Sequence, residues 1–459
     1  MTSARAFAEF VVSVVVPDKA LAVARNAFLD TMGVTLAGAV EPGSRIVQEL
    51  ATSEAAGPCR IFGTALQTSA TWAALANGAA AHALDFDDMC FVSLAHPSAP
   101  LVATALAVGE KLGATGRTLL EAYVAGFEIE AVLGRTMNPR HYQEGWHCTS
   151  TLGTVGAAAT AARILKLDAG RTTHCLAIAA SKASGLKENF GTMTKPLHVG
   201  MAARNGVMAA LLARKGFTAN DRVLEGPQGF LKAMASEKSD VDAVCQNLGR
   251  HWEILDTGIT VKLYPSCAAT HPALDAVLDL RQKHSLTPDQ IEAVEIQVDS
   301  VTPPLLAYDR PQTGLEGKFS MPFCVAAALV YGEVTLETFQ TQQIQNARVQ
   351  ELLPRITMRP NPALGKNAPA LTQAILTMRL RNGQVLTREA NGARGYPDRP
   401  ASPQDLDKKF ISCGLRALRR EQLEAALACL HRFETLSDVR QLTELLATEA
   451  VPKQETTAS

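Results

Sequence analysis

The sequence predicts a mainly α-helical protein, with a large all-helical domain and a smaller α+β domain inserted into it. Over the first 250 residues, apolar residues recur at helical spacing in one stretch after another. Near residue 260 the spacing changes to the alternation that is typical of strands. We therefore expect the helical domain to begin with residues 1–262, the α+β domain to span 263–396, and residues 397–459 to form C-terminal helices that rejoin the first domain.

The helices expected in the first part of the chain are rich in alanine and other small residues. Small side chains allow neighbouring helices to approach closely, and these stretches are too apolar for helices that face water. We therefore expect a compact bundle with several buried members, in which helices occupy residues 20–38, 69–84, 99–112, 119–133, 151–165, 173–183 and 196–215.

The α+β domain is predicted from two strand signals. Residues 291–300 alternate apolar and polar side chains, and residues 374–390 place Asn382-Gly383 between two alternating runs. Asn-Gly tolerates the positive φ of a tight turn, so the second signal predicts a hairpin. Helical patterns lie among these strands at 272–283, 322–331 and 346–353, and after a proline-rich linker at 396–405 they return at 405–413, 421–430 and 438–448.

Composition excludes several classes of protein. The 459 residues carry 44 Lys+Arg against 45 Asp+Glu, a formal net charge of −1, so no long-range attraction to nucleic acid or an anionic membrane is expected. With 47% hydrophobic residues the chain is globular rather than disordered. The nine cysteines show no CxxC pair and no disulfide framework, and no stretch has the length of a membrane span. We expect a cytoplasmic, enzyme-like protein.

Common nucleotide and nucleophile signatures are missing. The chain has no GxGxxG, no GxxxxGK[ST] and no GxSxG, and the glycine-rich stretch at 314–320 has the wrong spacing for a phosphate loop. A nucleotide cofactor is therefore not expected.

The first of four polar segments, residues 82–100, carries three acids within four residues. Helical spacing would put Asp85 and Asp88 on one face with Asp87 turned away, and His96 follows in a loop. Buried carboxylates need cations or hydrogen-bond donors, which predicts a functional cluster. The alternative is a solvated helix end with a capping aspartate.

The second and third segments place polar groups at helix starts. His147 is followed by Thr149 and Ser150, which suit either a capping run or an anion site. Lys195 stands where a helix dipole disfavours positive charge, so we expect an anionic partner or a lowered pKa. Arg204 is either a second anion contact or a plain surface residue.

The fourth segment, residues 262–276, brings His271 to the entry of another helix. Alone, such a histidine is often structural. Together the four segments could hold a small polycarboxylate while a histidine or Lys195 removes a proton next to a carboxylate. Sequence spacing does not establish that the segments meet in space.

In this order, the segments LDFDD with the following HPS, GWHCTSTLG, NFGTMTKPLHVGMAARNGV, YPSCAATH and KFSMP resemble the MmgE/PrpD family over nearly the whole chain. The resemblance implies a homodimer with an active site between the two domains and no metal or organic cofactor. It assigns the catalytic residues as Asp85, His96, His147, Lys195 and His271. Expected substrate contacts are Thr149, Ser150, Arg204, Lys262, Met89 and Phe323.

Two positions depart from the family pattern. Met89 stands where related decarboxylases and dehydratases often carry threonine, and Phe323 where the decarboxylase type carries tyrosine. The loss of two hydroxyls would remove hydrogen-bond partners for a substrate. This argues against cis-aconitate decarboxylation.

The function expected is a cofactor-independent lyase of the 2-methylcitrate dehydratase type, acting on a small di- or tricarboxylate by abstraction of the proton α to a carboxylate. The alternatives are an epimerase of an iminodisuccinate-like dicarboxylate and a cis-aconitate decarboxylase. Two rivals from other classes are an inactive dimeric scaffold and a metal hydrolase whose ligands would be His82, Asp85, Asp87, Asp88 and His96.

Overall fold

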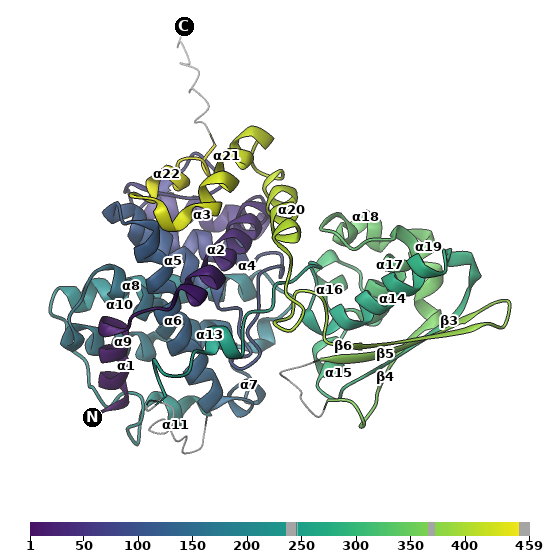
Figure 1. Cartoon of the computed structure of the whole chain (residues 1–459), viewed down its shortest axis with the longest axis horizontal. Coiled ribbons are helices and arrows are strands. Elements are labelled where there is room, and N and C mark those ends of the chain that lie inside the picture. The colour runs from purple at the N-terminus through teal and green to yellow at the C-terminus, as the bar shows by residue number, and fades with distance from the viewer. Residues whose placement is uncertain (236–244, 246, 366–371, 449–459) are drawn as a thin grey trace, which may run out of the picture.

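The computed structural model of the chain describes residues 1–235, 245, 247–365 and 372–448. A large helical part and a smaller part built on a four-stranded sheet lie side by side (Figure 1). The chain is mainly α, as the sequence predicts. Within the described ranges no helix has both the length and the apolar character needed to cross a membrane.

The helical part is formed largely by the first half of the chain, and most of its helices have buried faces of alanine and glycine. Its long helices are α1 (Ser3–Ser13), α2 (Asp18–Ala39), α3 (Pro42–Glu54), α4 (Ala70–His82), α5 (Ser98–Leu112), α6 (Gly116–Met137), α8 (Cys148–Ile164), α9 (Ala169–Lys182) and α10 (Thr194–Arg214). Shorter helices are α7 (Arg140–Gln143), α11 (Phe230–Ala235) and α13 (Glu253–Asp256), and two short strands, β1 (Cys59–Arg60) and β2 (Gln67–Thr68), pair antiparallel.

Two facing glycines allow α4 and α10 to pack unusually closely. A Cβ atom on Gly200 would lie 2.3 Å from the carbonyl oxygen of Leu75, and one on Gly78 would lie 3.1 Å from the Cα of Gly200. Side chains at either position would force the two helix backbones apart. This contact brings the start of α10, which carries Lys195, to the end of α4, where the acidic segment begins.

The C-terminal helices return to the helical part. They are α20 (Pro403–Gly414), α21 (Arg420–His431) and α22 (Arg440–Thr443), and α20 lies beside α2 (Figure 1). The Phe28 and Phe433 rings are 4.9 Å apart between centroids, within one hydrophobic cluster that also contains Phe7. Both ends of the chain therefore share a core, while the domain boundaries at 262 and 396 stay a prediction.

The remaining part has a sheet with the strand order β4-β3-β5-β6. Strand β3 pairs parallel with β4 and antiparallel with β5, and α14 and α17 pack on one face (Figure 1). Its own hydrophobic cluster lies between sheet and helices. The elements are α14 (His271–Lys283), β3 (Ile291–Val298), α15 (Thr302–Leu305), α16 (Gly314–Gly317), α17 (Met321–Tyr331), α18 (Thr341–Ile344), α19 (Ala347–Leu352), β4 (Ile356–Pro360), β5 (Gln373–Leu380) and β6 (Val385–Asn391).

Strongly periodic elements were predicted well. The seven helices expected before residue 216 are all present, and Gly383 has a φ of 85° in the turn of the predicted hairpin. No pattern in the sequence predicted α1, α3, the β1–β2 pair or β4, which are short or carry mixed patterns. Some predicted helices are too long: α4 ends at His82 rather than at residue 84, and of the helix expected at 438–448 only α22 (Arg440–Thr443) forms.

Gly200→Ala should destabilise the protein by about 1–3 kcal/mol, because the added methyl group overpacks the contact with α4. Gly43→Ala is the matched control, since a Cβ there meets only the Met193 side chain, at 3.4 Å or more. Urea unfolding of both variants measures the difference. Equal stabilities for the two would contradict the close packing described above.

Candidate active site

The acidic segment lies in an irregular loop between α4 and α5. The prediction that Asp85 and Asp88 share a helix face is wrong, because α4 ends at His82 and Asp85 has a φ of 53°. A positive φ is costly for a residue that carries a Cβ, and such strain persists only where the surroundings hold it.

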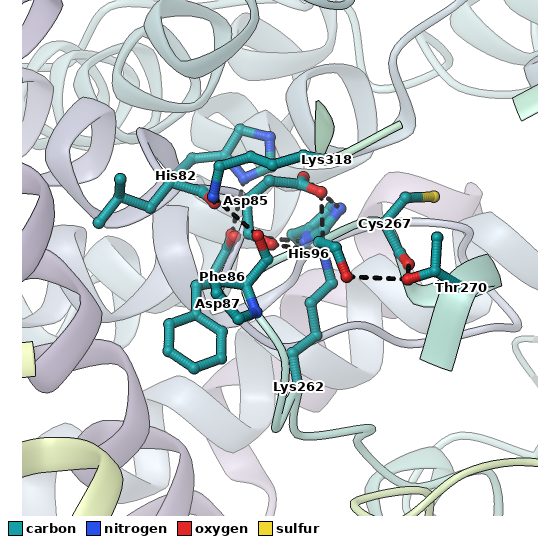
Figure 2. Close-up of polar contacts among 12 residues, drawn as sticks. His82, Asp85, Phe86, Asp87, His96, Lys262, Cys267, Thr270 and Lys318 are labelled. Atoms are coloured by element: carbon teal, nitrogen blue, oxygen red, sulfur yellow. Dashed lines mark hydrogen bonds and ion pairs between the residues drawn. The ribbon is translucent and has the colours of Figure 1, made fainter. Parts of the chain in front are cut away.

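Three buried lysines hold this loop by its backbone. Lys318 donates to the carbonyl of Leu84, Lys262 to that of Asp85 at 2.8 Å, and Lys409 to that of Phe86 at 2.8 Å. Figure 2 shows Lys262 and Lys318 converging on these residues. All three lysines are at most 7% exposed. We call residues 84–86 with these lysines the lysine clamp.

The Asp85 carboxylate binds two ammonium groups. Its Oδ1 is 2.5 Å from Lys195 Nζ and its Oδ2 is 3.1 Å from Lys262 Nζ. Burial alone would raise the pKa of Asp85, but Lys195 and Lys262 hold that pKa well below its ordinary value. Asp85 is therefore ionised, and it is the anionic partner expected for a lysine at a helix start.

Asp87 organises two histidines beside this ion cluster. Its Oδ2 is 2.8 Å from His82 Nδ1 and 3.5 Å from His96 Nδ1. Burial alone would raise the pKa of Asp87. His82 and His96 together outweigh this effect, so the pKa of Asp87 lies below its ordinary value. Burial also lowers the pKa of His82 to about 4, so His82 is neutral at pH 7 and donates to Asp87. Its Nε2 is buried without a hydrogen-bond partner among the described residues.

His147 occupies the N-cap position of α8 without a capping bond from its side chain, and it is 2% exposed. Its ring lies 5.7 Å from that of His82 and 5.0 Å from that of Phe190, between centroids. Burial first, then His82 and Lys195, hold the pKa of His147 well below its ordinary value. A neutral imidazole beside ammonium groups can accept a proton from carbon or, in its other tautomer, donate one.

The hydroxyls that follow His147 support neighbouring backbone. Thr149 Oγ1 accepts from the N–H of His96 at 3.0 Å, and Ser150 donates to the carbonyl of His198 at 3.1 Å. These contacts join the start of α8 to the acidic loop and to α10. The predicted role of Thr149 and Ser150 in substrate binding stays a prediction.

His271 approaches the site from the α+β side, at the start of α14. Its Nε2 is 3.2 Å from the carbonyl of Ser266, and its ring packs edge-on against Tyr264 at 5.2 Å between centroids. Burial, and then the charge of Lys262, lower the pKa of His271 to about 3. Its Nδ1 has no hydrogen-bond partner in the part of the chain that the structure describes.

Three other predicted substrate contacts pack against aromatic side chains, and their role in substrate binding stays a prediction. Arg204 stacks on Trp72 at 4.1 Å, and Trp72 is ten residues before His82 on α4, about 15 Å along a helix. Phe323 is fully buried against Phe339 in the α+β core. Met89 packs with an apolar group formed by Phe91, Ala393 and Tyr396.

Asp88 belongs to a separate buried network. Ser98 bonds its carboxyl group through both the backbone N–H, at 3.2 Å, and the hydroxyl, which also lies 2.6 Å from Tyr123 Oη. Burial raises the pKa of Asp88 to about 8, so the group is protonated at neutral pH. It caps α5 and helps to fix the His96 loop.

Four of the five ligands proposed for the metal-hydrolase alternative lie close together. Ligand atoms of His82, Asp85, Asp87 and His96 lie within 4.8 Å of one another, while Asp88 faces Ser98 instead. A divalent cation bound there would have to displace lysine ammonium groups from Asp85. Around the loop, Lys195, Lys262 and Lys409 face three carboxylates (Asp30, Asp85 and Asp87), and the buried Lys318 adds an amine whose pKa burial lowers to about 7.

Sequence reasoning missed Lys318, Lys409 and His198, and it considered His82 only as a metal ligand. The one local signal for Lys318 and Lys409 was a lysine beside strongly apolar neighbours, in KFSMP and KKF. Such a signal does not reveal the partner, which for Lys318 is 234 residues away.

Comparison with known families agrees with this architecture. Residues 5–241 match the family model of the MmgE/PrpD N-terminal domain, and residues 264–432 match that of the MmgE/PrpD C-terminal domain. The chain belongs to the MmgE/PrpD family. The resemblance seen in its motifs is thus confirmed.

Several curated relatives in this family are similar over most of their length. A cis-aconitate decarboxylase of Mus musculus is 31% identical over 394 residues, covering 82% of this chain and 78% of the relative. That of Homo sapiens is 27% identical, covering 95% and 92%. That of Aspergillus terreus is 25% identical, covering 94% and 92%.

Asp88→Asn should remove a pH dependence of stability. Because the folded-state pKa is raised to about 8, the native protein holds a proton between about pH 4 and 8 that the unfolded chain releases. Its free energy of unfolding therefore falls as pH rises through this window, by at most about 1.4 kcal/mol per pH unit from this group. Urea unfolding from pH 5 to 8 should give a flatter profile for the variant, and unchanged slopes would contradict the assignment.

Lys409→Met should cost about 3–5 kcal/mol, because it leaves Asp30 buried without its cation, 2.6 Å away in the native protein. The double variant Asp30→Asn/Lys409→Met should recover part of that loss, but not the hydrogen bond to Phe86. Thermal and urea unfolding of the single and double variants form a double-mutant cycle. Strictly additive effects would rule out a direct coupling between Asp30 and Lys409.

Proposed function

We propose that this protein is a lyase for a small di- or tricarboxylate that works by proton transfer at a carbon next to a carboxylate. The observation that carries the proposal is the Asp85 carboxylate held between Lys195 and Lys262, beside a neutral His147. Ammonium groups attract the substrate carboxylates, and a neutral imidazole exchanges the proton.

In the proposed mechanism, Lys195 and Lys262 stabilise the negative charge that develops on the reacting carboxylate. Asp85 fixes both ammonium groups in place before the substrate arrives, so little reorganisation accompanies the reaction. His147 moves the proton at carbon. His96 and His271 border the same cluster and are proposed to orient the second carboxylate.

Two outcomes share this chemistry. In decarboxylation of a substrate such as cis-aconitate, the electrons of the broken C–C bond form a new double bond. The electrons of the original C=C bond move to the carbon next to a remaining carboxylate, and that carbon accepts a proton. In dehydration, that carbon loses a proton and hydroxide leaves from the neighbouring carbon with a proton as water. The names of the relatives favour decarboxylation of cis-aconitate as the first reaction to test.

Loss of water from a 2-methylcitrate-like substrate is the second candidate. It is favoured by the absence of a hydroxyl at Phe323, where the decarboxylase type carries Tyr, whereas Met89 replaces a Thr that decarboxylases and dehydratases both often carry and so does not separate the two. The packing of these two side chains into apolar clusters weakens that argument. Independence from cofactors, a homodimeric state and a cytoplasmic location stay predictions.

The test is proton NMR in D₂O on EDTA-treated protein with cis-aconitate, 2-methylcitrate, citrate and iminodisuccinate. We expect loss of CO₂ or water from one of them, and a fall in kcat of about 100-fold or more for Lys195→Ala and His147→Asn. Lys215→Ala, at the exposed end of the same helix as Lys195, is the matched control and should keep full activity.

Each other result has a definite meaning. Proton exchange without loss of water or CO₂ would identify an epimerase. Activity that EDTA abolishes and a divalent metal restores would support the metal site of His82, Asp85, Asp87 and His96. Full activity of Lys195→Ala would refute the proposed mechanism.

A further inference from the structure

A second histidine connects the buried His147 with the surface. His198 lies on α10 one turn after Lys195, and its Nδ1 is 3.2 Å from the Nδ1 of His147. The ring centroids are 5.4 Å apart. Whereas His147 is 2% exposed, His198 is only half-buried.

Both rings are fixed by the same short stretch of chain. The N–H of His147 donates to the carbonyl of Gly185 at 3.0 Å, and a Cβ on Gly185 would lie 3.3 Å from Cγ of His198 and 2.9 Å from Cβ of Ser150. Gly185 has a φ of 124°, which side chains rarely tolerate. The Ser150 hydroxyl also bonds the His198 carbonyl. The contact between the two rings is therefore built into the fold.

A hydrogen bond between two neutral imidazoles needs one protonated and one free Nδ1. When His198 carries its proton on Nδ1, His147 carries its own on Nε2, and the reverse holds in the other state. Burial first and then Lys195 lower the pKa of His198, and burial, His82 and Lys195 lower that of His147. Lasting positive charge on either ring is thus disfavoured.

We propose that His198 is a relay residue that passes protons between solvent and His147 while the substrate fills the site. This deepens the proposed function and rests on it. His198 does not touch the reacting atoms; it acts through His147, and its position on α10 ties the relay to the helix that carries Lys195.

In the proposed relay, one proton moves from solvent to the substrate carbon through both rings. For delivery, His147 gives its Nε2 proton to the substrate carbon, the Nδ1 proton of His198 moves to Nδ1 of His147, and a solvent proton binds Nε2 of His198. Both rings end neutral with reversed tautomers, and one solvent proton has reached carbon. After product release, water gives a proton to Nε2 of His147, the Nδ1 proton of His147 returns to Nδ1 of His198, and water takes the proton from Nε2 of His198, which restores the starting tautomers. Proton abstraction runs the same path outward.

His198→Asn tests the relay, because an amide can still bond His147 Nδ1 but carries no proton onward. In weak buffer we expect kcat to fall about 10- to 100-fold with KM within twofold, on whichever substrate of the four-member panel the wild type consumes. Added imidazole should restore kcat in a saturable way. His174→Asn, a half-buried histidine on α9 that bonds Ala219, is the matched control and should respond to neither change.

The outcomes separate the two proposals. Wild-type turnover with an unchanged kcat for His198→Asn would overturn the relay alone, as would a loss that imidazole does not restore in a variant shown to be folded by circular dichroism. His198→Gln, tested in parallel, guards against a folding defect peculiar to one substitution. No turnover of any panel substrate by the wild type would overturn the proposed function, and the relay with it.

Discussion

The arrangement of the site depends on the lysine clamp. Backbone carbonyls of residues 84–86 accept hydrogen bonds from Lys318, Lys262 and Lys409, which come from the α+β part, the segment before it and the C-terminal helix α20. A buried ammonium group is costly to desolvate, so each lysine must find acceptors. The strained loop supplies these acceptors, and the hydrogen bonds from the lysines hold the positive φ of Asp85 in place. The Asp85 carboxylate thus sits where three distant parts of the chain meet.

The burial of these lysines and histidines also sets their protonation states. Burial lowers the pKa of Lys318 to about 7 although it bonds the carbonyls of Leu84 and Pro265, whereas Lys195 and Lys262 face the ionised Asp85 directly. Within one small region the protein therefore keeps charged ammonium groups, an amine near its titration point and neutral histidines. Groups of such different protonation can bind an anion and move a proton at the same pH.

Much of the fold follows from local pattern. The alanine-rich helices, the alternating strand at 291–298 and the Asn-Gly turn were predicted because each depends on residues a few positions apart. The positions of His147, Lys195 and His271 at helix starts were predicted for the same reason, as helix-start signals are local. The apolar periodicity ends near His82, and the prediction that the helix continues into the acidic segment was wrong.

The sequence by itself determined the mainly α class, the family and the residue types available for chemistry. Only the tertiary structure decided which of them meet. It joined Asp85 to Lys195 and Lys262 across 110 and 177 residues, turned Asp88 away to Ser98, and buried Phe323 in the core. It also paired His147 with His198. The physical reason is that a helix start or a turn is stabilised by near neighbours, whereas the partner of a buried charge is set by how closely whole helices pack, here through Gly78 and Gly200.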